Sequence, residues 1–132
     1  FKRLRWRTHV ETAGTIAWQH GPKLIDRWVV SPKLANSGMT ARRRLRFDVL
    51  RSYVDLGAAF KFVVVDPEDL DEVAAITRRV DIPPTSVWVM AEGTSAKAVA
   101  SRTAALADDV VARGWNLTTR LHVLAWADKR GR

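Results

Sequence analysis

The run at 58–65, AAFKFVVV, constrains the fold more than any other part of the sequence, because only Lys61 interrupts its apolar side chains. Runs that are apolar on both faces are typical of parallel strands covered on both sides. Similar or alternating patterns predict further strands at 8–13 (THVETA), 27–31 (RWVVS) and 86–90 (SVWVM). A chain with several such strands is expected to fold around one largely parallel sheet.

Helical patterns separate these strands. Apolar residues spaced by three and four predict a helix over 40–56, and a long Ala-rich segment predicts another over 95–113. Between them, Asp66 is expected to be the N-cap of a third helix, with Pro67 at its first position. The segment at 116–128, NLTTRLHVLAWAD, is expected to be a final strand or a strand with an extended tail.

The resulting order is β-β-α-β-α-β-α-β, which predicts an α/β fold with a parallel sheet and right-handed crossovers. The 132 residues, 47% of them hydrophobic, suit a single domain that covers residues 1–132. No apolar stretch approaches the roughly 18–20 residues that span a bilayer, so we expect a cytoplasmic protein without a membrane partner. The absence of cysteine excludes disulfides and thiolate-held metals within this chain.

The net charge of +8 raises the question of nucleic acid. One basic cluster, ARRRLRFDVLR at 41–51, is interpreted as the solvated face of a helix. The chain lacks a helix-turn-helix pattern and basic-aromatic interleaving on a strand, so nucleic acid is not the expected partner. An anionic small molecule or a partner protein would account for the charge equally well.

Polar residues follow several of the predicted strands, at the edge where parallel sheets bind ligands. Ser31 and Lys33 end one strand, and Glu92 with Gly93 ends another. Taken alone, the first pair is explained by a turn. The second pair is explained by strand-to-helix punctuation, with Thr94 or Ser95 as N-cap of the next helix.

Three charged or polar residues lie within the predicted strands themselves. Glu11 stands between Val10 and Thr12, where an unpaired carboxylate would be costly to bury. Lys61 points away from its aromatic neighbours, so it either lines a cavity or extends to water. His122 is a lone histidine, and taken alone it is explained by a hydrogen-bonded core residue. Nucleotide-binding glycine motifs, the nucleophile elbow and the zinc-protease motif are all absent.

Five segments together resemble a known family. VETAGT, VVSPKLANS, FKFVV, VWVMAEGT and TTRLHVLAWADKRG resemble, in this order, the second half of the 7-carboxy-7-deazaguanine synthases. These are radical S-adenosylmethionine enzymes of queuosine and 7-deazapurine biosynthesis. The resemblance covers the chain from about Thr8 to Gly131.

The resemblance implies half of a partial (βα) barrel, with a mostly parallel sheet and helices on one side. It implies a carbon-nitrogen lyase that contracts the ring of 6-carboxy-5,6,7,8-tetrahydropterin to give 7-carboxy-7-deazaguanine. The full-length enzyme is expected to use S-adenosylmethionine, a [4Fe-4S] cluster and Mg²⁺, and to form a homodimer.

The resemblance also implies roles for single residues. The expected contacts to S-adenosylmethionine are Ser31, Pro32, Lys33, Met90, Ala91, Glu92 and Gly93. The expected contacts to the substrate are Glu11, His122 and Arg132. Ala91 departs from the family, which usually has proline there, and a slightly looser strand tip is expected.

The family's Cys-x3-Cys-x2-Cys loop lies before residue 1, so no residue of this chain is expected to be catalytic or to bind a metal. The chain is therefore expected to be the carboxy-terminal part of such an enzyme, inactive without the missing amino-terminal half. The alternatives are a non-catalytic α/β module that binds a ligand or partner, and a basic nucleic-acid-binding domain.

Overall fold

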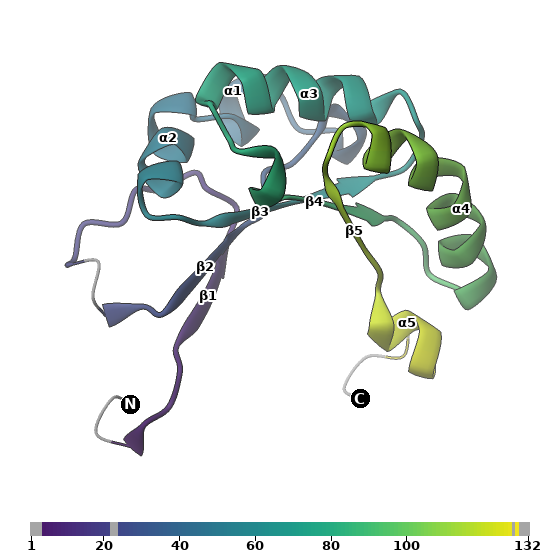
Figure 1. The fold of residues 1–132 in the computed structure, drawn as a ribbon, viewed down its shortest axis with the longest axis horizontal. Helices are drawn as coiled ribbons and strands as arrows, with labels where there is room; N and C mark the ends of the chain where they lie inside the picture. Colours follow the sequence, from purple (N-terminus) through teal and green to yellow (C-terminus); the bar gives the residue numbers. More distant parts are fainter. Residues whose placement is uncertain (1–3, 22–23, 128, 130–132) are drawn as a thin grey trace.

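The fold is a five-stranded parallel sheet covered by helices, as the computed structural model shows for residues 4–21, 24–127 and 129 (Figure 1). The strands follow one another across the sheet in sequence order, and each pairs in parallel with the next. They are β1 (His9–Thr12), β2 (Arg27–Val30), β3 (Ala59–Val64), β4 (Val87–Ala91) and β5 (Asn116–Thr118). The predicted α/β class and parallel sheet are confirmed.

Helices alternate with the strands along the chain. They are α1 (Ala41–Arg44), α2 (Phe47–Asp55), α3 (Asp69–Val80), α4 (Ala96–Ala112) and α5 (Leu121–Trp126), with 3₁₀ turns at Ala35–Ser37 and Pro84–Ser86. The first four helices cover one side of an arched sheet, and α5 follows β5 outside that layer (Figure 1). The expectation of helices on one side is confirmed.

Burial alternates along β3. Phe60, Phe62 and Val64 are fully buried against the helix layer, whereas Lys61 and Val63 on the other face are half-buried. Each buried side chain of this size contributes about 1.5–3 kcal/mol. The expectation that this strand is covered on both sides is wrong for the described residues, because one face of the sheet remains open and carries the lysine.

The helix expected over 40–56 is interrupted. α1 ends at Arg44 and α2 begins at Phe47, and Leu45 between them is extended with φ −119° and ψ 106°. Arg44 turns inward and is only 6% exposed, whereas Arg42 and Arg43 are exposed. The basic cluster is therefore not a uniformly solvated face, since one of its arginines belongs to the interior.

Two further boundaries differ from the sequence-based expectation. α3 begins at Asp69 rather than at Pro67, because the preceding residues form a turn, in which the carbonyls of Asp66 and Pro67 accept the N–H groups three residues on at 3.1 and 3.0 Å. Asp66 lies in the preceding turn and is not the N-cap. In α4, by contrast, Ser95 is the N-cap, with its hydroxyl accepting the N–H of Ala98 at 3.2 Å.

The segment 116–128, expected to be a final strand or a strand with an extended tail, is a strand only over Asn116–Thr118, and its last residue lies outside the described residues. β5 pairs with β4 up to Thr118, which lies opposite Met90, and the described residues 119–127 do not continue this pairing. Residues 121–126 form helix α5 instead, with the backbone hydrogen bonds of that helix. Val123 is its buried side chain, at 1% exposure.

Candidate functional site

The strand tips form one connected edge of the sheet. The N–H of Ser31, just after β2, donates to the carbonyl of Thr12 at 2.7 Å. The N–H of Glu92, just after β4, donates to the carbonyl of Val64 at 2.8 Å. The expected gathering of polar residues at the carboxyl ends of the strands is thus present in the fold.

The backbone of the Ser31–Lys33 tip is fixed by the Arg44–Glu72 ion pair. Ser31 and Pro32 are buried and Lys33 is exposed. The carbonyl of Lys33 accepts a hydrogen bond from Arg44 at 3.1 Å, and Arg44 lies 2.5 Å from Glu72. The tip therefore has a fixed backbone and one lysine side chain available to solvent.

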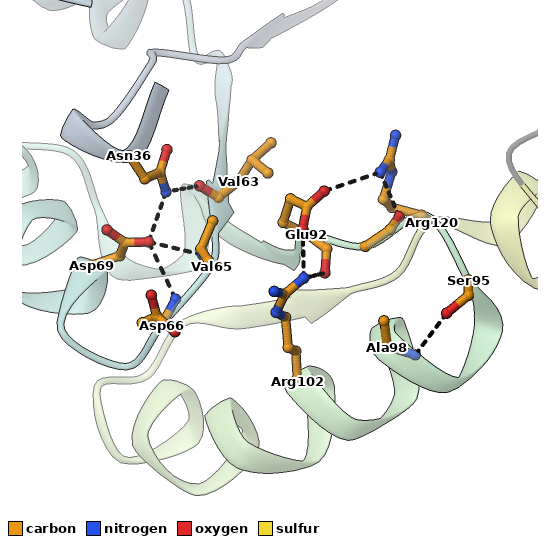
Figure 2. A network of polar contacts seen from close by, with 11 residues as sticks. Asn36, Val63, Val65, Asp66, Asp69, Glu92, Ser95, Ala98, Arg102 and Arg120 are labelled. Carbon is orange, nitrogen blue, oxygen red and sulfur yellow. Dashed lines mark hydrogen bonds and ion pairs between the residues drawn. The ribbon is translucent and has the colours of Figure 1, made fainter. Parts of the chain in front are cut away.

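The segment after this tip crosses to the end of β3, as Figure 2 shows. The Asn36 amide donates to the carbonyl of Val63 at 3.1 Å and to the carboxylate of Asp69 at 2.7 Å. The segments that follow β2 and β4 therefore flank the end of β3, one on each side (Figure 2).

In the second expected contact segment, Glu92 faces protein cations. Its carboxylate lies 2.5 Å from Arg102 of α4 and 4.0 Å from Arg120, and Arg120 also donates to the carbonyl of Gly93 at 2.6 Å (Figure 2). Gly93 has no room for a side chain, since a Cβ there would lie 2.9 Å from Val99. The side chain of Glu92 thus fixes the shape of the tip.

The sequence did not predict that Arg102 and Arg120 pair with Glu92. Arg102 lies in an Ala-rich helix, and Arg120 lies in a segment that was interpreted as a strand. One feature of the sequence could have predicted them. Glu92 at the β4 tip carries a carboxylate, and a partly enclosed carboxylate requires a cation nearby.

The open face of the sheet contains a hollow of about 230 Å³. It is lined by Glu11, Arg27, Val29, Ala59, Lys61, Trp88 and Thr118. The ammonium of Lys61 on β3 bonds to the carboxylate of Glu11 on β1, and the two side chains are 24% and 59% exposed. Lys61 therefore lines a cavity, which decides between its two interpretations.

The other expected substrate contacts lie elsewhere. His122 is exposed on α5, so the expectation of a core histidine is wrong, and it is not among the residues that line the hollow. Arg132 lies outside the described residues. Arg27, Trp88 and Thr118 were not predicted, although the two-residue period of strands places them on the same face as Lys61.

The sequence and the described residues also bear on metal binding and on membrane spans. A chain without cysteine does not fit an iron-sulfur cluster, whose ligands are cysteine thiolates. Within the part of the chain that the structure describes, no three His, Asp or Glu side chains are close enough together to hold a metal ion. The helices of residues 4–21, 24–127 and 129 include none that is long and apolar enough to cross a bilayer.

Three proteins named 7-carboxy-7-deazaguanine synthase are similar to this chain over nearly its whole length. The synthase of Halobacterium salinarum is 33% identical over 147 residues, covering 95% of this chain and 56% of that protein. The synthase of Pyrobaculum aerophilum is also 33% identical, over 93% of this chain and 54% of that protein. That of Rhodopirellula baltica is 27% identical, over 92% and 51% respectively.

The chain is therefore related to the 7-carboxy-7-deazaguanine synthases. The chain spans about half the length of these synthases, and the resemblance drawn from its motifs is confirmed. No protein-family model matches the chain.

Proposed function

We propose that this chain is the carboxy-terminal part of a 7-carboxy-7-deazaguanine synthase that acts in queuosine and 7-deazapurine biosynthesis. The observation that carries the proposal is similarity to synthases over 92–95% of the chain. The reaction would be the ring contraction of 6-carboxy-5,6,7,8-tetrahydropterin with loss of ammonia.

The two strand tips are the proposed site for S-adenosylmethionine. Lys33 offers an exposed ammonium for the ligand's carboxylate, whereas Ser31 is buried and would shape the tip from within. Bound S-adenosylmethionine supplies the 5′-deoxyadenosyl group of radical chemistry. The carboxylate of Glu92 is already paired with Arg102 and Arg120. The tip at 90–93 would therefore contact the ligand through its backbone and through Met90.

The substrate would lie over the open face, where Glu11 is partly exposed. His122 and Arg132 are further proposed contacts from the carboxy-terminal segment. We expect residues outside this chain to hold the cluster and Mg²⁺ and to form the other half of the barrel. The chain alone is therefore expected to be inactive, and the full-length protein to be a cytoplasmic homodimer.

The decisive experiment compares two proteins. One is the 132-residue chain, and the other carries in addition the sequence encoded upstream of Phe1. After reconstitution with iron and sulfide, we expect only the longer protein to convert 6-carboxytetrahydropterin to 7-carboxy-7-deazaguanine, measured by mass spectrometry. If the longer protein neither cleaves S-adenosylmethionine nor forms product, the proposed function is wrong.

A matched pair of variants tests the ligand site. In the longer protein, Lys33→Met is expected to raise the KM for S-adenosylmethionine by about tenfold, because a charged hydrogen bond contributes about 1.5–3 kcal/mol. Lys97→Met removes an exposed lysine from α4 and should leave this KM unchanged.

A further inference from the structure

The Glu11–Lys61 ion pair links two strands that are not neighbours. β2 lies between β1 and β3 in the sheet, and Glu11 is opposite Val29 of that intervening strand. The Lys61 side chain therefore reaches over β2 on the open face of the arch. The contact fixes the direction of the Glu11 carboxylate, which would otherwise move freely on an edge strand.

One oxygen of this carboxylate remains available. Lys61 bonds to Oε1, and within residues 4–21, 24–127 and 129 no donor bonds to Oε2. The Glu11 side chain is 59% exposed at the hollow, so a ligand can reach it. A carboxylate held in this way is an acceptor for a ligand with N–H donors.

The remaining lining favours a flat ring. Trp88, which lies opposite Lys61 on β4, provides an aromatic surface in the hollow, and Val29 and Ala59 add apolar lining. The volume of about 230 Å³ is below the roughly 300–1,000 Å³ of sites that take drug-sized ligands, which favours a small fused ring system. Arg27 and Lys61 against Glu11 give the lining a net charge of +1, which suits a ring that carries a carboxylate.

We infer that Lys61 is a positioning residue, which holds Glu11 so that its carboxylate accepts the N–H groups of an aminopyrimidinone ring lying against Trp88. This deepens the proposed function and rests on it for the ligand class, a carboxylated pterin. Lys61 acts through Glu11, so it determines selectivity for the 2-amino group of the ring.

Two stable aromatic probes test this assignment. 6-Carboxypterin carries the 2-amino group, and 6-carboxylumazine has an oxygen in its place. We expect the 132-residue chain to bind the pterin about tenfold more tightly by calorimetry, because the lumazine loses a charge-assisted hydrogen bond. Equal affinities, or no binding of either probe, would overturn the inference.

Variants then separate positioning from folding. Lys61→Met and Glu11→Gln should each weaken pterin binding about tenfold and abolish the preference over lumazine. Lys61→Arg should restore the preference, and the double variant should lose no more than either single one. Lys97→Met is the matched control on α4 and should bind as the unaltered chain does. A preference that persists in Lys61→Met refutes the role.

The experiments distinguish a wrong role for Lys61 from a wrong proposed function. If the longer protein makes 7-carboxy-7-deazaguanine with the same KM for the pterin in Lys61→Met, the function stands and the inference is wrong. If probe binding depends on Lys61 but no deazapurine forms, the pterin site stands and the proposed reaction is wrong.

Discussion

The guanidinium of Arg44 lies 2.5 Å from the carboxylate of Glu72 and ties the loop after β2 to α3. The same guanidinium donates to the carbonyls of Lys33 at 3.1 Å and Met39 at 3.2 Å. The other oxygen of Glu72 accepts the N–H of Ala35 at 2.8 Å. One partly enclosed ion pair thus fixes both sides of the loop that begins with the proposed S-adenosylmethionine contacts.

Replacing this arginine should strongly destabilise the chain. Arg44→Met leaves Glu72, whose side chain is 23% exposed, without its cation and leaves two carbonyls without a donor. Breaking a buried pair typically costs 3–5 kcal/mol, and we expect about 3 kcal/mol here because Glu72 is partly solvated. Urea unfolding followed by circular dichroism measures the change.

The matched control is the preceding residue. Arg43 is exposed on the same helix, so Arg43→Met should change the free energy of unfolding by no more than about 0.5 kcal/mol. If both variants lose the same stability, the effect comes from helix propensity or net charge and not from the ion pair.

Gly14 is the position at which a single methyl group should be most damaging. Its φ is +70°, and a Cβ there would lie 2.6 Å from both Leu50 and Val30. Backbone strain of about 1–3 kcal/mol and overpacking of about 1–3 kcal/mol both oppose Gly14→Ala. We expect a loss of about 2–5 kcal/mol in thermal or urea unfolding.

Gly38 separates the two causes. It has a similar φ of +72° but no atom within 4 Å of an added Cβ. Gly38→Ala should therefore show the backbone strain alone, about 1 kcal/mol. A loss at Gly38 as large as that at Gly14 would show that crowding contributes nothing.

The sequence was sufficient for those parts of the fold that depend on local pattern. The run at 58–65 predicted β3 because apolar side chains are needed wherever a strand meets a helix layer. The local sequence pattern did not predict the structure where a polar side chain pairs with a residue far away in the chain. Arg44 has the local pattern of a surface residue on a basic helix, but it is buried, pairs with the distant Glu72 and is the last residue of α1.

The site shows the same division. The tips of the strands were predictable because parallel strands end at one edge of a sheet. The pairing of Glu92 with two arginines was not predictable, because Arg102 stands ten residues further on in an Ala-rich helix and Arg120 is in a segment with an ambiguous pattern. Sequence spacing identifies which residues share an edge, but not which of them neutralise one another.

Asp69 should be important for the turn after β3. Its Oδ2 accepts the N–H of Val65 at 2.8 Å and the amide of Asn36 at 2.7 Å. Asp69→Ala leaves both donors without this acceptor, and we expect a loss of about 2–3 kcal/mol in urea unfolding. Asp69→Asn keeps an acceptor oxygen and should recover part of the loss.

Asp71 is the control on the same helix. Its carboxylate is 85% exposed and lies 3.5 Å from Arg113. Asp71→Ala should cost no more than about 0.5 kcal/mol, since exposed ion pairs contribute little. An equal loss at the two positions would mean that the negative charge near the start of α3 matters more than the hydrogen bonds of Asp69.

Arg120 should control the rigidity of the β4 tip more than the stability of the chain. It donates to the carbonyl of Gly93 at 2.6 Å and lies 4.0 Å from Glu92. Arg120→Met removes this link, while Arg102 still holds Glu92 at 2.5 Å. We expect the amide of Glu92 to exchange with deuterium about fivefold faster, which corresponds to a loss of about 1 kcal/mol in local stability.

Arg113→Met is the matched variant. Arg113 follows α4 and pairs with Asp109 at 3.2 Å, far along the chain from the β4 tip. This change should leave exchange at Glu92 unaltered, because it breaks no contact of the tip. Acceleration in both variants would indicate global unfolding, whereas acceleration in neither would show that Arg102 alone holds Glu92.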